Sequence, residues 1–248
     1  MEYCQLGRTG ARVSRLCLGT MNFVGSTDLP EAKRIIDEAL DAGINFVDTA
    51  DVYARGGSEE YVGTALKENG RRDEVVLATK AVARMGDGPN DHGASRYHLT
   101  RAVEDSLRRL QTDRIDLFYL HITDITTPLD EILETLDVLV RQGKILYIGT
   151  SKWPVPLFLE LLTLAEIHGL PQTVAEQPPY NLTDRRIEWE LVWACMRKGI
   201  AIVPFGPLAG GILSGVYRKG KKAPPGHHFK EVGQRDGHNR YTEESMDL

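Results

Sequence analysis

Four side chains of complementary chemistry follow short apolar runs in this sequence: Asp48, Tyr53, Lys80 and His121. A lysine ammonium favours the charged form of a neighbouring phenol, so we expect Lys80 to lower the pKa of Tyr53 from about 10 toward neutrality. Asp48 would keep Lys80 charged and oriented, and His121 could hydrogen-bond a carbonyl oxygen. Such a set combines a general acid with an electrophilic clamp and suits the reduction of a C=O group. Because none of these side chains can supply a hydride, a cofactor must do so.

These residues recur within a regular alternation of strand-like and helix-like segments. Each short apolar run precedes an amphipathic segment of helical period, which usually ends in a glycine. Successive runs begin roughly 30 residues apart, the length of one strand–helix unit. Strict alternation predicts a parallel sheet, and units of similar length favour a closed (β/α)8 TIM barrel. The seven runs are Ser14–Gly19, Ile44–Asp48, Val75–Lys80, Ile115–His121, Ile145–Ser151, Thr173–Gln177 and Ile200–Phe205.

An open, doubly wound sheet is the alternative architecture. Its G-x-G-x-x-G fingerprint is absent after the first run, which reads Leu18-Gly19-Thr20-Met21-Asn22. In a barrel, the carboxyl ends of the strands meet at one mouth, where reactive groups gather. The polar residues expected around that mouth are Asp48, Lys80, His121, Ser151 with Lys152, and Gln177.

Several residues predict where helices begin and pack. Asp28 and Glu31 indicate a capping box, with a proline in the first turn. Ser58 is expected to cap the next helix. Trp189 and Trp193 lie four residues apart, which predicts one helix that packs against the sheet or a neighbouring subunit.

The two ends of the chain differ from the alternating part. Residues 1–13 predict an N-terminal hairpin with Gly7 or Gly10 in its turn. Residues 218–248 predict a loop or a disordered tail, and no eighth strand is visible. We therefore expect one barrel domain over residues 1–248 that is a fragment, is completed by another chain, or closes in some other way. Gly215–Lys222 nearly spells a P-loop but lacks the final Ser or Thr, so we reject it as a phosphate site.

Composition excludes several function classes. The 248 residues are 42% hydrophobic and 26% charged, which is typical of a soluble globular protein. A net charge of −5 argues against nucleic acid or an anionic membrane as a partner. The sequence has no apolar run of about 18 residues and no secretory signal. Its three widely spaced cysteines predict neither disulfides nor a zinc site. We therefore expect a cytoplasmic protein. His227-His228 lacks a third ligand, and no metal is expected.

Several ordered motifs resemble those of the aldo-keto reductase family, in particular the branch with bacterial general reductases and potassium-channel β subunits. The resemblance implies a (β/α)8 barrel and NADPH-dependent carbonyl reduction without a metal. It further implies that Asp48, Tyr53, Lys80 and His121 form a catalytic tetrad with Tyr53 as the acid. The matching segments are Gly43–Ala50 with Tyr53, Ala78–Lys80, Leu120-His121-x-x-Asp124, Gly149–Ser151 and Glu176–Asn181.

The same resemblance implies a nicotinamide cofactor site. Ser151 and Gln177 would hold the carboxamide, Phe205 would stack on the ring, and Lys152 stands where the family commonly has Asn. A Gly-rich loop would wrap the pyrophosphate, because its backbone N–H groups are natural anion ligands. NADPH is expected and NADH is left open. The cofactor-binding residues are Gly19, Thr20, Met21, Asp48, Ser151, Lys152, Gln177, Phe205, Gly206, Pro207, Leu208, Gly210 and Gly215.

The substrate is expected to be a small carbonyl compound, and the sequence leaves a homo-oligomer open. Two other functions compete with reduction: a nucleotide-binding module with little turnover, and a Schiff-base lyase that uses Lys80. Asp48 argues against the lyase because a partner anion raises a lysine pKa. The residues expected to contact substrate are Met21, Phe23, Tyr53, His121, Ile122 and Trp153.

Overall fold

The computed structural model describes residues 1–216. The predicted tail at 218–248, the His227-His228 pair and most of the P-loop-like segment lie outside these residues.

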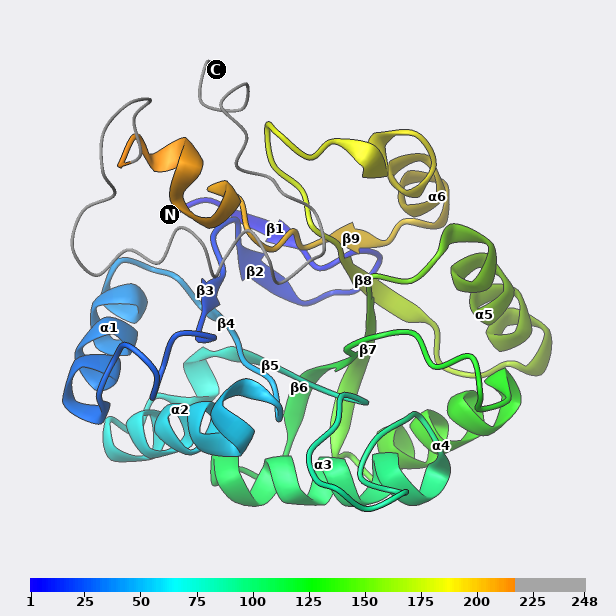
Figure 1. Ribbon diagram of the computed structural model, residues 1–248, viewed down its shortest axis with the longest axis horizontal. Coiled ribbons are helices and arrows are strands. Elements are labelled where there is room, and N and C mark those ends of the chain that lie inside the picture. Colours follow the sequence, from blue (N-terminus) through cyan, green and yellow to red (C-terminus); the bar gives the residue numbers. More distant parts are fainter. Residues whose placement is uncertain (217–248) are drawn as a thin grey trace.

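Seven parallel strands form one sheet in sequential order, β3-β4-β5-β6-β7-β8-β9, and it curls with helices α1 to α6 on its outside (Figure 1). A sequential order is that of a barrel, since the order in a doubly wound sheet reverses partway across. The predicted barrel-type architecture is confirmed, with β3 and β9 at the two edges of the described sheet. The strands are β1 Tyr3–Gln5, β2 Arg12–Ser14, β3 Leu18–Gly19, β4 Phe46–Asp48, β5 Val76–Ala81, β6 Ile115–Leu120, β7 Ile145–Ser151, β8 Thr173–Gln177 and β9 Ala201–Ile202. The helices are α1 Leu29–Asp41, α2 Gly57–Glu68, α3 Arg96–Leu110, α4 Leu129–Arg141, α5 Val155–His168 and α6 Leu191–Lys198.

The N-terminal hairpin packs against the amino-terminal end of the sheet. β1 and β2 pair antiparallel, as predicted. Gly7 occupies the turn with φ 57°, and a Cβ there would lie 2.4 Å from the carbonyl oxygen of Val174. Only glycine allows this approach, so Gly7, rather than Gly10, is the turn residue that matters. Ser14 belongs to the hairpin and not to the first barrel strand.

Two predictions about helices need correction. Ser58 does not cap α2, because that helix begins one residue earlier and the hydroxyl of Ser58 donates to the carbonyl oxygen of Thr20 instead. Trp189 precedes α6 rather than lying within it, and Trp193 is 62% exposed. Neither tryptophan packs against the sheet. By contrast, Asp28 caps α1 as predicted and accepts a bond from the Glu31 amide.

The core has two parts because the sheet is buried on both faces. A large apolar cluster lies between sheet and helices, and a smaller one fills the barrel interior. Tyr119, fully buried, belongs to the interior cluster. A Cβ on Gly149 would lie 2.3 Å from its ring, so this glycine makes room for the tyrosine. The interior cluster comprises Leu6, Val13, Phe46, Ala78, Leu117, Tyr119 and Ala175.

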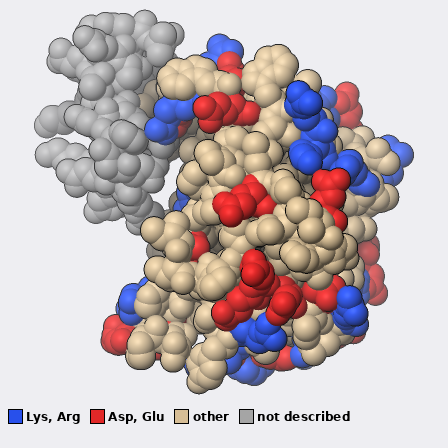
Figure 2. All heavy atoms as spheres, turned by 90° about the vertical axis from the view of Figure 1, so that its right-hand side faces the viewer, with Lys and Arg blue, Asp and Glu red and all other residues tan. Residues whose placement is uncertain are grey.

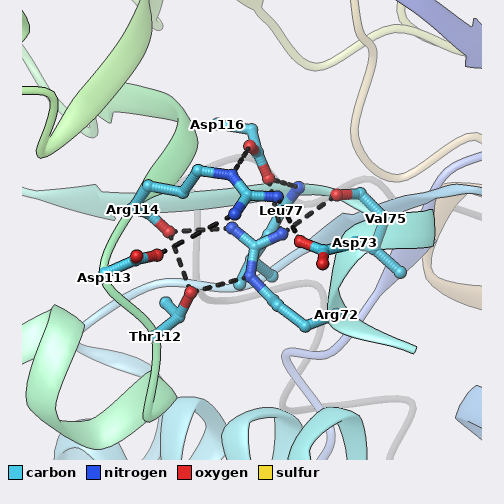
Figure 3. Close-up of polar contacts among 8 residues, drawn as sticks. All are labelled: Arg72, Asp73, Val75, Leu77, Thr112, Asp113, Arg114 and Asp116. Atoms are coloured by element: carbon cyan, nitrogen blue, oxygen red, sulfur yellow. Dashed lines mark hydrogen bonds and ion pairs between the residues drawn. The ribbon is translucent and has the colours of Figure 1, made fainter. Parts of the chain in front are cut away.

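A dense ion-pair network ties the amino-terminal ends of β5 and β6 together (Figure 3). Asp116 accepts from Arg72 at 2.8 Å, from Arg114 at 3.2 Å and from the Leu77 amide at 2.8 Å. Arg72 also binds the carbonyl oxygens of Val75 and Arg114. Both oxygens of the carboxylate are therefore paired.

The outer surface carries both signs of charge. Figure 2 shows acidic and basic side chains interspersed with neutral ones over one face. Within residues 1–216, no helix is long and apolar enough to cross a membrane.

Candidate active site

The predicted site residues converge at the carboxyl ends of neighbouring strands. Asp48 ends β4, Ser151 ends β7 and Gln177 ends β8. Lys80 is the second-last residue of β5, and His121 directly follows β6. Because parallel strands end at the same edge, these side chains surround one mouth.

The Lys80–Asp48 pair lies at the centre of this site. The Lys80 Nζ lies 2.5 Å from Oδ1 of Asp48 and donates to the carbonyl oxygen of Thr49 at 2.7 Å. Lys80 is fully buried. Burial by itself lowers the pKa of a lysine, but the charge of Asp48 and the phenol of Tyr53 outweigh it and raise the pKa of Lys80. Asp48 thus keeps Lys80 charged, as predicted.

Tyr53 begins a short 3-10 turn beyond β4 and points its hydroxyl at this pair. The hydroxyl lies 3.4 Å from the Nζ of Lys80, which in turn is 4.9 Å from the centre of the phenol ring. The expected fall in the Tyr53 pKa is wrong, because burial raises it more than Lys80 lowers it. Tyr53 therefore stays a protonated phenol at neutral pH, which is the state that a proton donor needs.

His121 faces Tyr53 edge to face, with ring centres 5.8 Å apart. Burial, together with the charges of Lys80 and Lys152, lowers the pKa of His121 to about 3. The imidazole is therefore neutral at physiological pH. Its Nδ1 is buried and has no hydrogen-bond partner in the part of the chain that the structure describes.

Gln177 makes a contact that the sequence did not reveal. Its Nε2 donates to Oδ2 of Asp48 at 2.9 Å, so both oxygens of that carboxylate are fixed. The Ser151 hydroxyl donates to the main-chain oxygen of Gln177 at 2.8 Å. The two residues expected to hold a carboxamide are thus linked to each other and to the buried ion pair.

The residues after β3 split into exposed and buried positions. Gly19 has open space above it, since an added Cβ would meet nothing within 4 Å, and Met21 is 55% exposed. Thr20 is fully buried and its hydroxyl donates to the main-chain oxygen of Asp48. Its amide also donates to the Asp48 oxygen and its carbonyl oxygen accepts from Ser58, so Thr20 fixes β3 against β4 and offers no free polar group to a cofactor.

The Gly-rich segment after β9 forms an exposed loop with a cradle-like backbone. Gly206, Gly210 and Gly215 all have positive φ, and a Cβ on Gly206 or Gly215 would meet nothing within 4 Å. Pro207 and Leu208 are exposed between them. The segment includes the short 3-10 helix Ala209–Ser214, and the amides of Gly211 and Gly215 already donate to main-chain oxygens. The open space over Gly206 and Gly215 leaves room for a bound pyrophosphate. Phe205 is half-buried and precedes this loop, and its amide donates to the Pro178 oxygen.

The expected substrate-contacting residues do not share one environment. Ile122 is 39% exposed beside His121, and Met21 is exposed in the turn that follows β3. Phe23 and Trp153 are each 4% exposed and belong to the cluster between sheet and helices. Met21 and Ile122 are therefore the exposed residues of this set, whereas Phe23 and Trp153 belong to the apolar core.

Two buried acids near the mouth escaped the sequence analysis. Asp51 is 1% exposed, and burial together with the charge of Glu59 raises its pKa to about 8. Glu176 is fully buried, and burial raises its pKa to about 7 even though it accepts from the Trp153 amide. The sequence held a signal for both acids, because Glu176 directly precedes Gln177 and Asp51 lies between Asp48 and Tyr53. Among residues 1–216, no group of three or more His, Cys, Asp or Glu side chains could hold a metal ion.

Comparison with known proteins assigns this arrangement to a family. The model of the aldo/keto reductase family matches residues 15–247. The oxidoreductase YrpG of Bacillus subtilis is 46% identical over 87% of this chain and 69% of its own length. A probable voltage-gated potassium channel subunit beta of Oryza sativa is 40% identical, over 89% of this chain and 68% of its own. The aldo-keto reductase YhdN of Bacillus subtilis is 37% identical, over 87% of this chain and 64% of its own. The chain belongs to the aldo/keto reductase family of nicotinamide-dependent oxidoreductases that act on carbonyl groups.

Proposed function

We propose that the protein reduces an aldehyde or ketone to an alcohol with NADPH, and that Tyr53 donates the proton. The observation that carries this proposal is the Tyr53 hydroxyl, which lies 3.4 Å from a buried lysine that is itself bound to Asp48. When bound, NADPH supplies the hydride, which none of these side chains can provide.

Each tetrad residue has a separate task in this proposal. Tyr53 gives its proton to the carbonyl oxygen, and Lys80 stabilises the phenolate that remains. Asp48 holds Lys80 in place. His121 is neutral and orients the carbonyl through a hydrogen bond. A well-placed general acid contributes about 10²–10⁴ in rate.

The cofactor would lie across the mouth. Ser151 and Gln177 would hold the carboxamide, with Lys152 beside them, while Phe205 would stack on the ring. The loop from Gly206 to Gly215 would wrap the pyrophosphate through its backbone. Gly19 and Met21 would line the side opposite, while the buried Thr20 holds β3 against β4. NADPH is the proposed form, and turnover measured with NADPH and with NADH compares the two cofactors directly.

Steady-state kinetics with NADPH and a nitrobenzaldehyde test the reaction, read as loss of nicotinamide absorbance. We expect turnover in the wild type and almost none in Tyr53→Phe. Tyr97→Phe is the matched control, since Tyr97 is exposed on α3 away from the tetrad. Equal rates in wild type and Tyr53→Phe, or no turnover in either, contradict the proposal.

Two other functions receive less support. A Schiff-base lyase needs a neutral Lys80, but the Asp48 and Tyr53 contacts raise its pKa. A cofactor-binding module without turnover remains a candidate because two relatives at 40% and 38% identity are named as probable potassium channel β subunits. Calorimetry separates the cases, since NADPH binding without turnover favours the module. The free thiols Cys4, Cys17 and Cys195 fit the cytoplasmic location that we propose.

A further inference from the structure

Asp51 is a buried acid without a counter-ion beside the active site. It lies between Asp48 and Tyr53, and its amide donates to the main-chain oxygen of Lys80 at 3.0 Å. The residue is 1% exposed, and neither carboxyl oxygen receives a side-chain hydrogen bond from the described part of the chain. A buried carboxylate in this state is costly, so the site favours the protonated acid.

The nearest guanidinium is committed to a different carboxylate. Nε of Arg109 donates to Glu59 at 2.6 Å, and the hydroxyl of Thr79 donates to the other oxygen of Glu59 at 2.6 Å. Glu59 is fully buried. Arg109 therefore neutralises Glu59, and the added negative charge of Glu59 further disfavours an ionised Asp51.

Asp51 lines a cavity of about 270 Å³ that none of the four tetrad residues lines. It lies between one face of α3 and the loop that joins β5 to α3. Nδ1 of His98 is 3.0 Å from the Asn90 carbonyl oxygen and must donate to it, so Nε2 presents a buried lone pair without a partner among the described residues. The cavity has room for several water molecules at about 30 Å³ each, and these could bond both groups.

The charged and titratable groups around Asp51 come from every element packed against it. Among these charged groups, Asp51 is the acid that no basic side chain compensates. These groups are Tyr53 in its own loop, Glu59 on α2, Lys80 on β5, Asp91 in the β5–α3 loop, and His98, Arg101, Asp105 and Arg109 on α3.

We propose that Asp51 is a positioning residue that sets the strength of Tyr53 as an acid. Hydrated from the cavity, Asp51 stays uncharged while the enzyme works. When Asp51 gives its proton to the cavity water at alkaline pH, the new negative charge raises the pKa of Tyr53 and slows proton donation. This inference rests on the proposed role of Tyr53.

The first test is the pH dependence of kcat for carbonyl reduction. If only the uncharged form of Asp51 supports full activity, the wild-type rate falls about tenfold between pH 7 and pH 9. Asp51→Asn cannot ionise and is expected to lose less than twofold over the same range. An unchanged alkaline fall in Asp51→Asn overturns the proposal.

Two further variants separate tuning from a structural effect. Asp105→Asn alters the same cavity, but Asp105 pairs with Arg108 on the surface of α3, so the wild-type pH profile is expected to persist. Glu59→Gln removes a negative neighbour and releases Arg109, so the alkaline fall moves to lower pH. A purely structural role predicts lower rates without a shifted profile, and that result also overturns the proposal.

Difference infrared spectroscopy tests the charge state without turnover. We expect wild type minus Asp51→Asn to show the C=O stretch of a protonated carboxylic acid at pH 7, with loss of this band at pH 9. Absence of the band at pH 7 overturns the inference. If the wild type turns over no carbonyl compound, the proposed function fails, and the infrared band still decides the state of Asp51.

Discussion

Two ion-pair networks lie at opposite ends of β5, and they differ in how completely their polar groups are paired. At the amino-terminal end of β5 and β6, Asp116 binds Arg72, Arg114 and a backbone amide (Figure 3). At the carboxyl-terminal end of β5, Lys80 binds Asp48 closely. Its contact with the Tyr53 hydroxyl is longer, at 3.4 Å, and therefore weaker.

The difference separates a stabilising network from a reactive one. Arg72 uses its planar guanidinium to bind Asp116, Thr112 and two carbonyl oxygens, so little capacity is left for a ligand. At the mouth, the Tyr53 hydroxyl is weakly held, and Nδ1 of His121 has no partner in the described chain. Unused hydrogen-bonding capacity, more than burial or charge, distinguishes the candidate active site.

Substitution of the weakly held phenol gives the largest expected effect. Tyr53→Phe removes the proton donor and is expected to reduce kcat by about 10²–10⁴, or roughly 3–5 kcal/mol in the barrier. Calorimetry is expected to show NADPH binding and a melting temperature close to the wild type. A variant that keeps a tenth or more of the wild-type rate contradicts the assignment.

Substitution in the opposite network is expected to affect stability rather than rate. Arg72→Met leaves Asp116 buried with part of its pairing lost, so the free energy of unfolding falls by about 3–5 kcal/mol. Urea denaturation measures this change, and the rate per folded molecule stays within about twofold of the wild type. The control is Arg185→Met, which breaks an exposed pair with Glu188 and costs about 0–1 kcal/mol. Equal losses in the two variants refute the comparison.

The free energy of unfolding is expected to depend on pH through the buried Glu176. Its pKa is raised from 4.5 to about 7, so between these values the unfolded chain releases a proton that the folded chain retains. The free energy of unfolding therefore falls as pH rises from about 4.5 to 7, by roughly 3–4 kcal/mol at about 1.4 kcal/mol for each pKa unit, and the loss is complete above pH 7. Glu176→Gln is expected to flatten this slope in urea denaturation at several pH values. A slope equal to that of the wild type would show that another group is responsible.

The smallest effect concerns His121. With a pKa of about 3, its imidazole stays neutral from pH 5 upward, so its protonation leaves no acidic limb in the rate profile. The measurement is kcat from pH 5 to 7 for wild type and His121→Gln. An acidic limb that is present in the wild type and vanishes in the variant would show that His121 titrates and that its environment is less buried than described.

The pairing partners at the mouth depended on packing that local sequence does not encode. Lys80 and Asp48 could be predicted as a pair, since they lie at the carboxyl ends of neighbouring strands. Gln177 lies 129 positions from Asp48, and no spacing rule predicts its bond to that carboxylate. Phe23 and Trp153 follow strand ends as pocket residues should, yet they turn into the apolar core.

The sequence alone determined the alternating elements and the N-terminal hairpin, because periodicity and turn glycines are local properties. It placed the ends of β4, β7 and β8 correctly, but the last predicted run, Ile200–Phe205, contains only the two-residue strand β9. The tertiary structure decided the protonation states. Lys80 alone would lower the pKa of Tyr53, but burial reverses the sign, and Asp51 and Glu176 become weak acids for the same reason. Desolvation depends on everything that surrounds a group, and that is known only once distant segments are packed together.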